Sequence, residues 1–82
     1  MEIELRIRLY GRLADAIGRE IMLEAPLPCS VGEVRRRLAA SHAAAAGALE
    51  RSRALIGGSF VSDERTLADA DLVEFLPPVS GG

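Results

Sequence analysis

The sequence predicts one α+β domain, in which a single mixed sheet curls over one main helix. Three observations support this fold class. Apolar and polar residues alternate strictly along residues 2–9, an amphipathic helical pattern begins near residue 30, and another strand pattern lies close to the C-terminus. At 82 residues the chain is shorter than a typical domain. We therefore expect one small core and no deep catalytic pocket.

The first third of the chain predicts two strands joined by a short helix. Along residues 2–9 every apolar side chain falls on one face, which indicates a half-buried strand. By the same alternation Tyr10 points to the polar side. Residues 12–17 are predicted to form a short helix that ends at Gly18. Apolar and polar residues alternate again along residues 19–25, which indicates a second strand. This second strand can pair with the first.

The main helix has a clear starting signal. Ser30 and Glu33 fit a capping box, in which the serine oxygen accepts from the Glu33 amide and the glutamate reaches back to the Ser30 amide. The alanine run at residues 43–46 favours continuation of the helix, and Gly47 is expected to interrupt or end it. The apolar positions on one face are Val31, Val34 and Leu38.

The last third of the chain predicts a short hairpin and a final strand. Residues 54–56 and 59–61 flank a Gly57-Gly58 turn, and residues 72–76 form the last strand. Within that strand Val73 and Phe75 share one face, so Leu76 falls on the opposite, solvent-exposed face. We divide the chain into a domain at residues 1–76 and an extended tail at 77–82.

Composition narrows the function. The net charge is −2 and aromatic residues make up 4%, which argues against a nucleic-acid partner. The single cysteine, Cys29, cannot form an internal disulfide or a metal cluster, so we expect no metal. No apolar run has the length of a membrane span or signal peptide. We expect a cytoplasmic protein without a membrane partner.

Several chemically capable side chains have simpler structural interpretations. Cys29 has no charged activator nearby in the sequence, so an inert thiol is the better interpretation. His42 is expected to be a solvated helix residue. Residues 35–37 are consecutive arginines that point in different directions, which favours a solvated face over an anion site. Turn formation explains Asp69 and Asp71 better than acid or base catalysis.

The C-terminal tail carries the most distinctive chemistry. Its two prolines favour an extended arm, and its two terminal glycines make the end thin enough for a narrow channel. We expect the arm to be mobile until a partner encloses it. A carboxylate on Gly82 is a poor electrophile and needs activation by a partner enzyme. A bare Gly-Gly end, however, is also common as an idle terminus. The tail residues are Pro77, Pro78, Val79, Ser80, Gly81 and Gly82.

Residues 65–71, the last strand and the Gly81-Gly82 end resemble those of ubiquitin-like β-grasp proteins. The run Phe75-Leu76-Pro77-Pro78-Val79-Ser80-Gly81-Gly82 resembles the terminus of the small subunit of molybdopterin synthase, the MoaD type. This resemblance covers nearly the whole chain and implies the ubiquitin-like β-grasp fold.

The resemblance also implies a role as a sulfur carrier that is not an enzyme on its own. A ubiquitin-activating-like enzyme of the MoeB type would use ATP to adenylate Gly82, which then becomes a thiocarboxylate. The tail, residues 77–82, would thread into the large synthase subunit of the MoaE type, in a two-plus-two heterotetramer. There the sulfur would pass to cyclic pyranopterin monophosphate. No permanently bound cofactor is implied for the carrier.

Similar proteins dock on their partners through an exposed apolar surface. The matching positions here, which we call the docking patch, are Tyr10, Phe60 and Leu76. Strand alternation independently places Tyr10 and Leu76 outward, whereas Phe60 rests on the resemblance alone. The sequence departs from the family pattern at Ile56-Gly57-Gly58, where relatives often carry a valine-asparagine pair.

Other functions remain open at this stage. The same fold could serve a ThiS-like carrier for thiamin thiazole synthesis, or a ubiquitin-like modifier joined to lysines of target proteins. The Pro-Pro-Val-Ser segment and the helical length favour the synthase subunit. A hypothesis from a different class of function is a non-catalytic β-grasp interaction domain with an idle tail.

Overall fold

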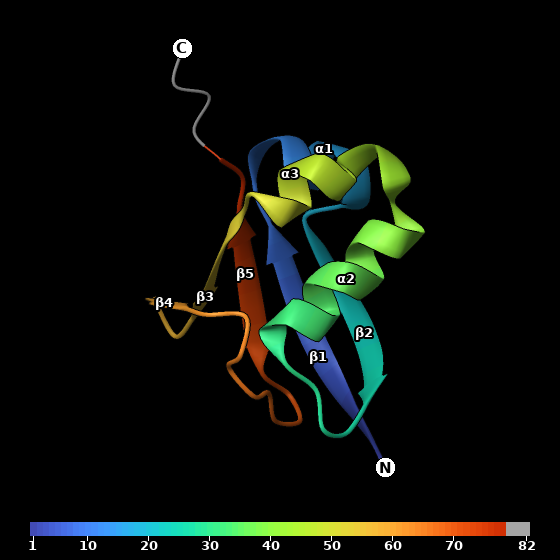
Figure 1. The fold of residues 1–82 in the computed structure, drawn as a ribbon, viewed down its shortest axis with the longest axis vertical. Helices are drawn as coiled ribbons and strands as arrows, with labels where there is room; N and C mark the ends of the chain where they lie inside the picture. Colours follow the sequence, from blue (N-terminus) through green and yellow to red (C-terminus); the bar gives the residue numbers. More distant parts are fainter. Residues whose placement is uncertain (79–82) are drawn as a thin grey trace.

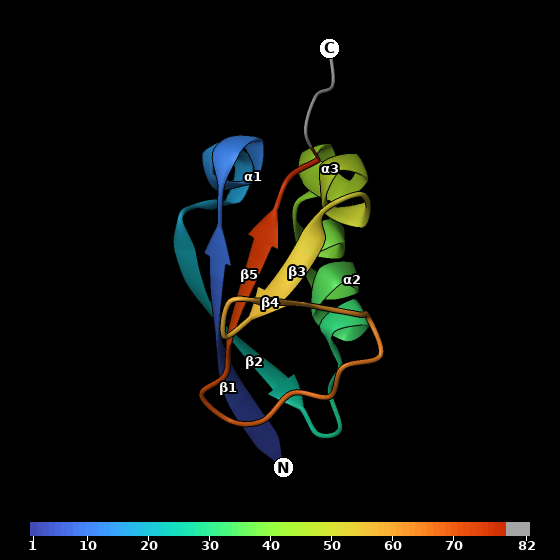
Figure 2. The same ribbon diagram turned by 90° about the vertical axis from the view of Figure 1, so that its left-hand side faces the viewer.

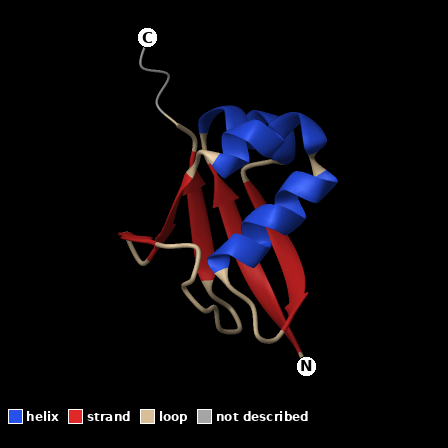
Figure 3. Cartoon of the chain, in the orientation of Figure 1, coloured by secondary structure: helices blue, strands red, loops and turns tan. Residues whose placement is uncertain are grey.

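The chain builds one mixed sheet with a long helix across one of its faces (Figures 1 and 3). A computed structural model describes residues 1–78 of the chain. No helix in this part is long and apolar enough to cross a membrane. The strands are β1 (Glu2–Leu9), β2 (Glu20–Pro26), β3 (Arg53–Ile56), β4 (Ser59–Val61) and β5 (Leu72–Leu76). The helices are α1 (Gly11–Ile17), α2 (Val31–Ser41), the 3₁₀ turn η1 (Ala43–Ala45) and α3 (Ala46–Glu50).

The first and last strands lie side by side in the middle of the sheet. The strand order is β2-β1-β5-β3-β4, with β1 and β5 parallel and the other three pairs antiparallel. In the parallel pair Leu9 is opposite Phe75. Both strands point toward the end of the sheet where α1 and α3 lie (Figure 1). The base of the C-terminal tail therefore lies beside the junction of β1 and α1.

The hydrophobic core lies between the sheet and α2. The predicted alternation in β1 and β5 is confirmed, because their inward side chains are almost completely buried. The apolar face of α2 meets them, and Figure 2 shows this helix along one side of the sheet. Burying each large apolar side chain contributes roughly 1.5–3 kcal/mol. The predicted α+β fold is confirmed. Its central buried residues are Leu5, Ile7, Leu9, Val31, Val34, Val73 and Phe75.

The start of α2 agrees with half of the predicted capping box. Ser30 Oγ accepts a hydrogen bond from the Glu33 amide at 3.3 Å. The Glu33 carboxylate does not reach back to Ser30 but pairs with Arg36 at 2.9 Å and Arg37 at 3.7 Å. Charge-assisted bonds to guanidinium groups are stronger than a bond to a neutral amide, which explains the difference. Residues 63 and 65 supply the remaining caps, since their carbonyls accept from the first two helix amides.

The prediction that the helix continues through residues 43–46 is wrong. α2 ends at Ser41, His42 leaves the helical region with φ −133° and ψ 71°, and the chain turns through η1 into α3. This turn brings Ala45 and Leu49 into the core. Alanine propensity favours helix but does not determine its direction, so burial decides where the helix breaks. Gly47 lies inside α3 and ends nothing.

The predicted hairpin at residues 54–61 is confirmed. Gly57 and Gly58 both have positive φ, 59° and 82°, as expected for the tight turn that joins two antiparallel strands. The division into residues 1–76 and 77–82 stays a prediction. The expected mobility of Gly81 and Gly82 concerns residues outside the described range.

Candidate functional site

The candidate site is the outer face of the sheet at the end of β5, where the tail begins. Pro77 and Pro78 follow the strand and are half-buried. The ring of Pro77 lies against Gly11, at the start of α1. The other predicted tail residues, Val79, Ser80, Gly81 and Gly82, lie outside the described residues. The described part of the site is therefore the surface around the base of the tail.

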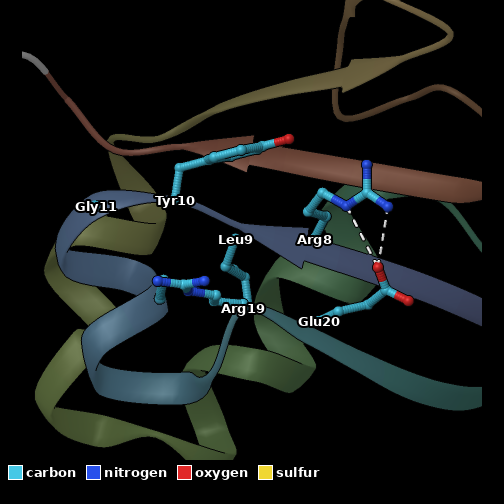
Figure 4. Close-up of a pocket in the computed structure, with 7 residues that line it drawn as sticks. Arg8, Leu9, Tyr10, Gly11, Arg19 and Glu20 are labelled. Atoms are coloured by element: carbon cyan, nitrogen blue, oxygen red, sulfur yellow. Dashed lines mark hydrogen bonds and ion pairs between the residues drawn. The ribbon is translucent and has the colours of Figure 1, made fainter.

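The docking patch is brought together by strand pairing and by one residue that the sequence did not single out. Tyr10 is 36% exposed, and its hydroxyl donates to Glu74, so its ring lies along β5 (Figure 4). Leu76 pairs with Arg53 across β5 and β3. The Arg53 guanidinium lies 3.8 Å from the centroid of the Phe60 ring. Arg53 thus connects Phe60 on β4 to Leu76 on β5.

Two details of this patch differ from expectation. Leu76 was predicted to be solvent-exposed but is half-buried, because β5 is a central strand with β1 and β3 on either side. Phe60 is exposed, with 53% of its surface accessible, and a cation holds its ring from one side. The alternation within β3 places Arg53 on the outer face, but only the strand register shows that it lies opposite Leu76, and only the ring contact shows that it reaches Phe60.

A charged network lies beside the patch. The Arg8 guanidinium contacts Glu20 at 3.0 Å and Glu74 at 3.9 Å, and Arg6 contacts Glu20 at 3.3 Å. The hydrogen bonds from Arg8 and Arg6 lower the pKa of Glu20. The hydrogen bond to Glu74 raises the pKa of the Tyr10 phenol. Both shifts move these groups away from neutral pH, so neither is suited to general acid or base catalysis there.

A hollow of about 390 Å³ opens between the end of β1, α1 and the start of β2 (Figure 4). Its lining includes Tyr10, Gly11 and Arg19, together with the Arg8–Glu20 ion pair. The hollow adds concave surface next to the base of the tail. Its chemistry suits recognition of another molecule's surface, because the charges of Arg8 and Glu20 are paired with each other.

The remaining candidates lie away from this surface. Cys29 is 2% exposed, burial raises its pKa, and its thiol faces the Ser30 carbonyl at 3.7 Å, in agreement with an inert role. Asp71 accepts from the amide of residue 68 at 2.8 Å, which confirms its predicted turn role, whereas Asp69 accepts from the Glu4 amide at 2.8 Å and links the turn to β1. His42 is not a solvated helix residue but the half-buried end of α2.

The prediction of a solvated face for residues 35–37 is wrong at Arg35. Its side chain is 13% exposed and turns inward, toward the junction of α3 and β3. It donates to the Ser52 carbonyl at 2.9 Å and to Ser52 Oγ at 2.7 Å, and it pairs with Asp63 at 2.9 Å. Arg36 stays on the surface, 70% exposed. Consecutive helix residues do point in different directions, and one of those directions is inward.

Comparison with solved structures places this arrangement among small ubiquitin-like proteins. The Haloferax volcanii HVO 2177 protein matches with a TM-score of 0.86 and 28% identity, covering 99% of this chain and 88% of that one. Small archaeal modifier protein 1 from Methanosarcina acetivorans matches with a TM-score of 0.78 and 26% identity, covering 100% and 99%. One chain in the complex of subunits 1 and 2 of the molybdopterin-converting factor from Helicobacter pylori also matches. Its TM-score is 0.69 and its identity 18%, and the match covers 98% of this chain and 100% of that one.

A search of curated protein sequences found no match. The family comparison is decisive, because residues 7–82 match the ThiS family model and so include the end of β1, the helices, the remaining strands and the tail. The similarity therefore extends over both the folded domain and the Gly-Gly tail. The chain belongs to the ThiS family and has the ubiquitin-like β-grasp fold of MoaD-type sulfur carriers.

Proposed function

We propose that this protein is the cytoplasmic sulfur-carrying subunit of a molybdopterin synthase. The observation that carries the proposal is the juxtaposition at the end of β5. The tail leaves the sheet at Pro77, directly beside the docking patch and the hollow next to Tyr10. A partner that binds this surface is therefore in position to receive the tail. The terminal run from Phe75 to Gly82, which resembles that of the MoaD type, supports the same role.

In this proposal Gly82 carries the reacting group. The carboxylate attacks the α-phosphate of ATP in a MoeB-type activating enzyme and forms an acyl adenylate with release of pyrophosphate. Sulfide released by a sulfur donor then attacks the acyl carbon, the bond to AMP breaks, and a thiocarboxylate remains on Gly82. In the large subunit of the MoaE type, this sulfur passes to cyclic pyranopterin monophosphate. The catalytic side chains would belong to the partners, and this chain would supply the cargo and its delivery.

The Helicobacter pylori complex of subunits 1 and 2 supports a large-subunit partner, since one of its chains shares this fold. A two-plus-two assembly would place each tail in a neighbouring large subunit. The exposed Phe60 ring is suited to such an interface, because aromatic side chains and arginine are enriched at interface centres and Arg53 stacks on it.

A second candidate is a ubiquitin-like modifier. The similarity to small archaeal modifier protein 1 favours it, because that structure covers the whole chain at 26% identity. In this case the activated Gly82 would be joined to an amine of a target protein, and no sulfur would be delivered. A carrier for thiamin thiazole synthesis is a third use of the same thiocarboxylate.

The intact mass of the protein separates these functions. The protein is incubated with a MoeB-type enzyme, ATP and a sulfur donor, next to a chain that lacks Gly82. Replacement of one oxygen by sulfur in the full chain alone would support a sulfur carrier. Addition of the large subunit and cyclic pyranopterin monophosphate should then produce molybdopterin. No mass change, under conditions that load a known carrier, would favour an interaction domain with an idle tail.

The docking patch has a matched control within the chain. Phe60 and Met22 are both 53% exposed, but Met22 lies on β2, at the other edge of the sheet. Phe60→Ala should weaken binding of the large subunit at least tenfold, because truncation of an interface aromatic often costs more than about 1.4 kcal/mol. Met22→Ala should leave the affinity within twofold. Equal effects of the two substitutions would remove Phe60 from the interface.

A further inference from the structure

Gly11 lies where the tail begins, and its missing side chain makes room for Pro77. A Cβ atom on Gly11 would lie 3.0 Å from Cγ of Pro77 and 3.9 Å from its Cδ. Carbon atoms pack best at about 3.5–4.0 Å. The proline ring is closed onto its own backbone nitrogen, so it cannot swing away as a flexible side chain would. A side chain at position 11 must therefore push on the backbone of Pro77.

Backbone conformation alone does not require glycine at this position. Gly11 has a φ of +54°, which is in the left-handed region. Ala70 has a φ of +70° in the same protein, so this fold tolerates an alanine in that region. A non-glycine residue in this region lowers the free energy of unfolding by roughly 1–2 kcal/mol, which a folded domain can tolerate. The contact with Pro77 is the feature that distinguishes position 11.

We infer that Gly11 is a positioning residue for the C-terminal tail. It lets Pro77 seat against the start of α1 and thereby sets the direction in which the chain leaves β5. Tyr10, the neighbouring residue, belongs to the docking patch, so one short segment both meets the partner and orients the tail. This inference rests on the proposed function, in which the tail delivers Gly82 to a partner's active site.

A change at this contact alters the direction in which the tail leaves β5. Pro77 and Pro78 are consecutive, and two fixed φ angles transmit a change of direction instead of absorbing it. A shift of a few tenths of an ångström at Pro77 therefore changes the direction in which Pro78 continues from β5. The partner's channel must then accept the tail from a changed direction, and a misplacement of 1 Å at a reacting centre can cost about 100-fold in rate.

The test compares two glycines with the same backbone conformation. Gly57 has a φ of +59° but nothing within 4 Å of its would-be Cβ, and it lies at the tip of the β3–β4 hairpin. Gly11→Ala and Gly57→Ala therefore share the backbone strain, and only the first meets Pro77. Pro77→Ala and the double variant Gly11→Ala with Pro77→Ala complete the set, because removal of the ring removes the collision.

Two quantities are measured for each variant. The first is the position of Pro77, from nuclear Overhauser contacts between its ring protons and residue 11 and from its carbon chemical shifts. The second is the rate of sulfur transfer from the thiocarboxylate form to cyclic pyranopterin monophosphate in the large subunit, as kcat and KM separately. We expect Gly11→Ala to shift the Pro77 signals and to lower kcat at least fivefold relative to Gly57→Ala. The double variant should be no slower than Pro77→Ala.

Equal Pro77 signals and equal kcat in Gly11→Ala and Gly57→Ala would overturn the inference. If Gly11→Ala does not fold, recovery of folding in the double variant would support the contact, and failure to recover would refute it. If the wild-type chain cannot be loaded with sulfur, the proposed function fails. The Pro77 signals then still decide whether Gly11 positions the base of the tail.

Discussion

Replacing Arg35 by methionine should destabilise the fold strongly, although the sequence places it in a run of surface arginines. Its guanidinium donates to the carbonyls of Leu49 and Ser52 and to Ser52 Oγ, and it pairs with Asp63. It also lies 5.3 Å from the Phe75 ring centroid. One side chain of α2 thus holds the end of α3, the start of β3 and the loop after β4.

The cost can be worked out from these contacts. In Arg35→Met the Leu49 carbonyl keeps the Ser52 hydroxyl as a donor at 2.6 Å, whereas the Ser52 carbonyl loses its Arg35 donor. A buried acceptor without a partner costs about 1–3 kcal/mol, and bonds to a charged donor contribute about 1.5–3 kcal/mol. Asp63 is 49% exposed, so its ion pair adds little. Because these contributions overlap and methionine regains some packing, we expect a net loss of about 2–3 kcal/mol.

Arg36→Met is the matched control on the same helix. Arg36 is 70% exposed and pairs with Glu33 three residues away, an interaction that contributes about 0.2–0.5 kcal/mol. Urea unfolding, followed by circular dichroism, compares the two. With a slope of about 1 kcal/mol per molar for a small domain, Arg35→Met should lower the midpoint by about 2–3 M and Arg36→Met by less than about 0.5 M. Midpoints within 0.5 M of each other would show that Arg35 is not a structural clamp.

Three further predictions concern single contacts. The hydrogen bond to Glu74 raises the pKa of Tyr10, so its contribution to folding stability is present at neutral pH and is lost as the pH rises through that pKa. Tyr10 is the only tyrosine in the sequence, so its phenolate absorbance can be titrated directly. Glu74→Gln should move this titration back toward the ordinary pKa of tyrosine. Ser30→Ala removes the cap of α2 and should cost about 1 kcal/mol in urea unfolding, whereas Ser41→Ala at the exposed helix end should cost less than half of that. Ala70→Gly relieves a φ of +70° and should stabilise the fold by about 0.5–1 kcal/mol, and a lower melting temperature would contradict this.

The strands were predictable because their signal is local. Alternation in residues 2–9 and 72–76 records which side of the sheet is buried, and the structure has β1 and β5 over the same residues. The Gly57-Gly58 turn is equally local, since two adjacent residues with positive φ need glycine. Such patterns report on burial and on backbone conformation, which are properties of each residue in its own segment.

The helical region was predicted less well because its outcome depends on distant partners. The inward turn of Arg35 requires the carbonyls at the end of α3 and the Asp63 carboxylate, neither of which adjoins it in sequence. The break after Ser41 depends on where Leu49 can be buried. The alanines at residues 43–46 have high helix propensity in either arrangement, so packing decides between them.

The base of the tail also depends on partners that are distant in the sequence. Alternation places Tyr10 and Leu76 on one face, but it does not reveal that β1 and β5 are parallel neighbours. That pairing brings residues 10 and 11 beside residues 76 and 77, more than sixty positions further along the chain. An antiparallel arrangement of these two strands would place the start of α1 and the start of the tail at opposite ends of the sheet. The parallel pairing of the first and last strands therefore places the predicted docking patch next to the base of the tail. The contact between Gly11 and Pro77 exists because of this pairing.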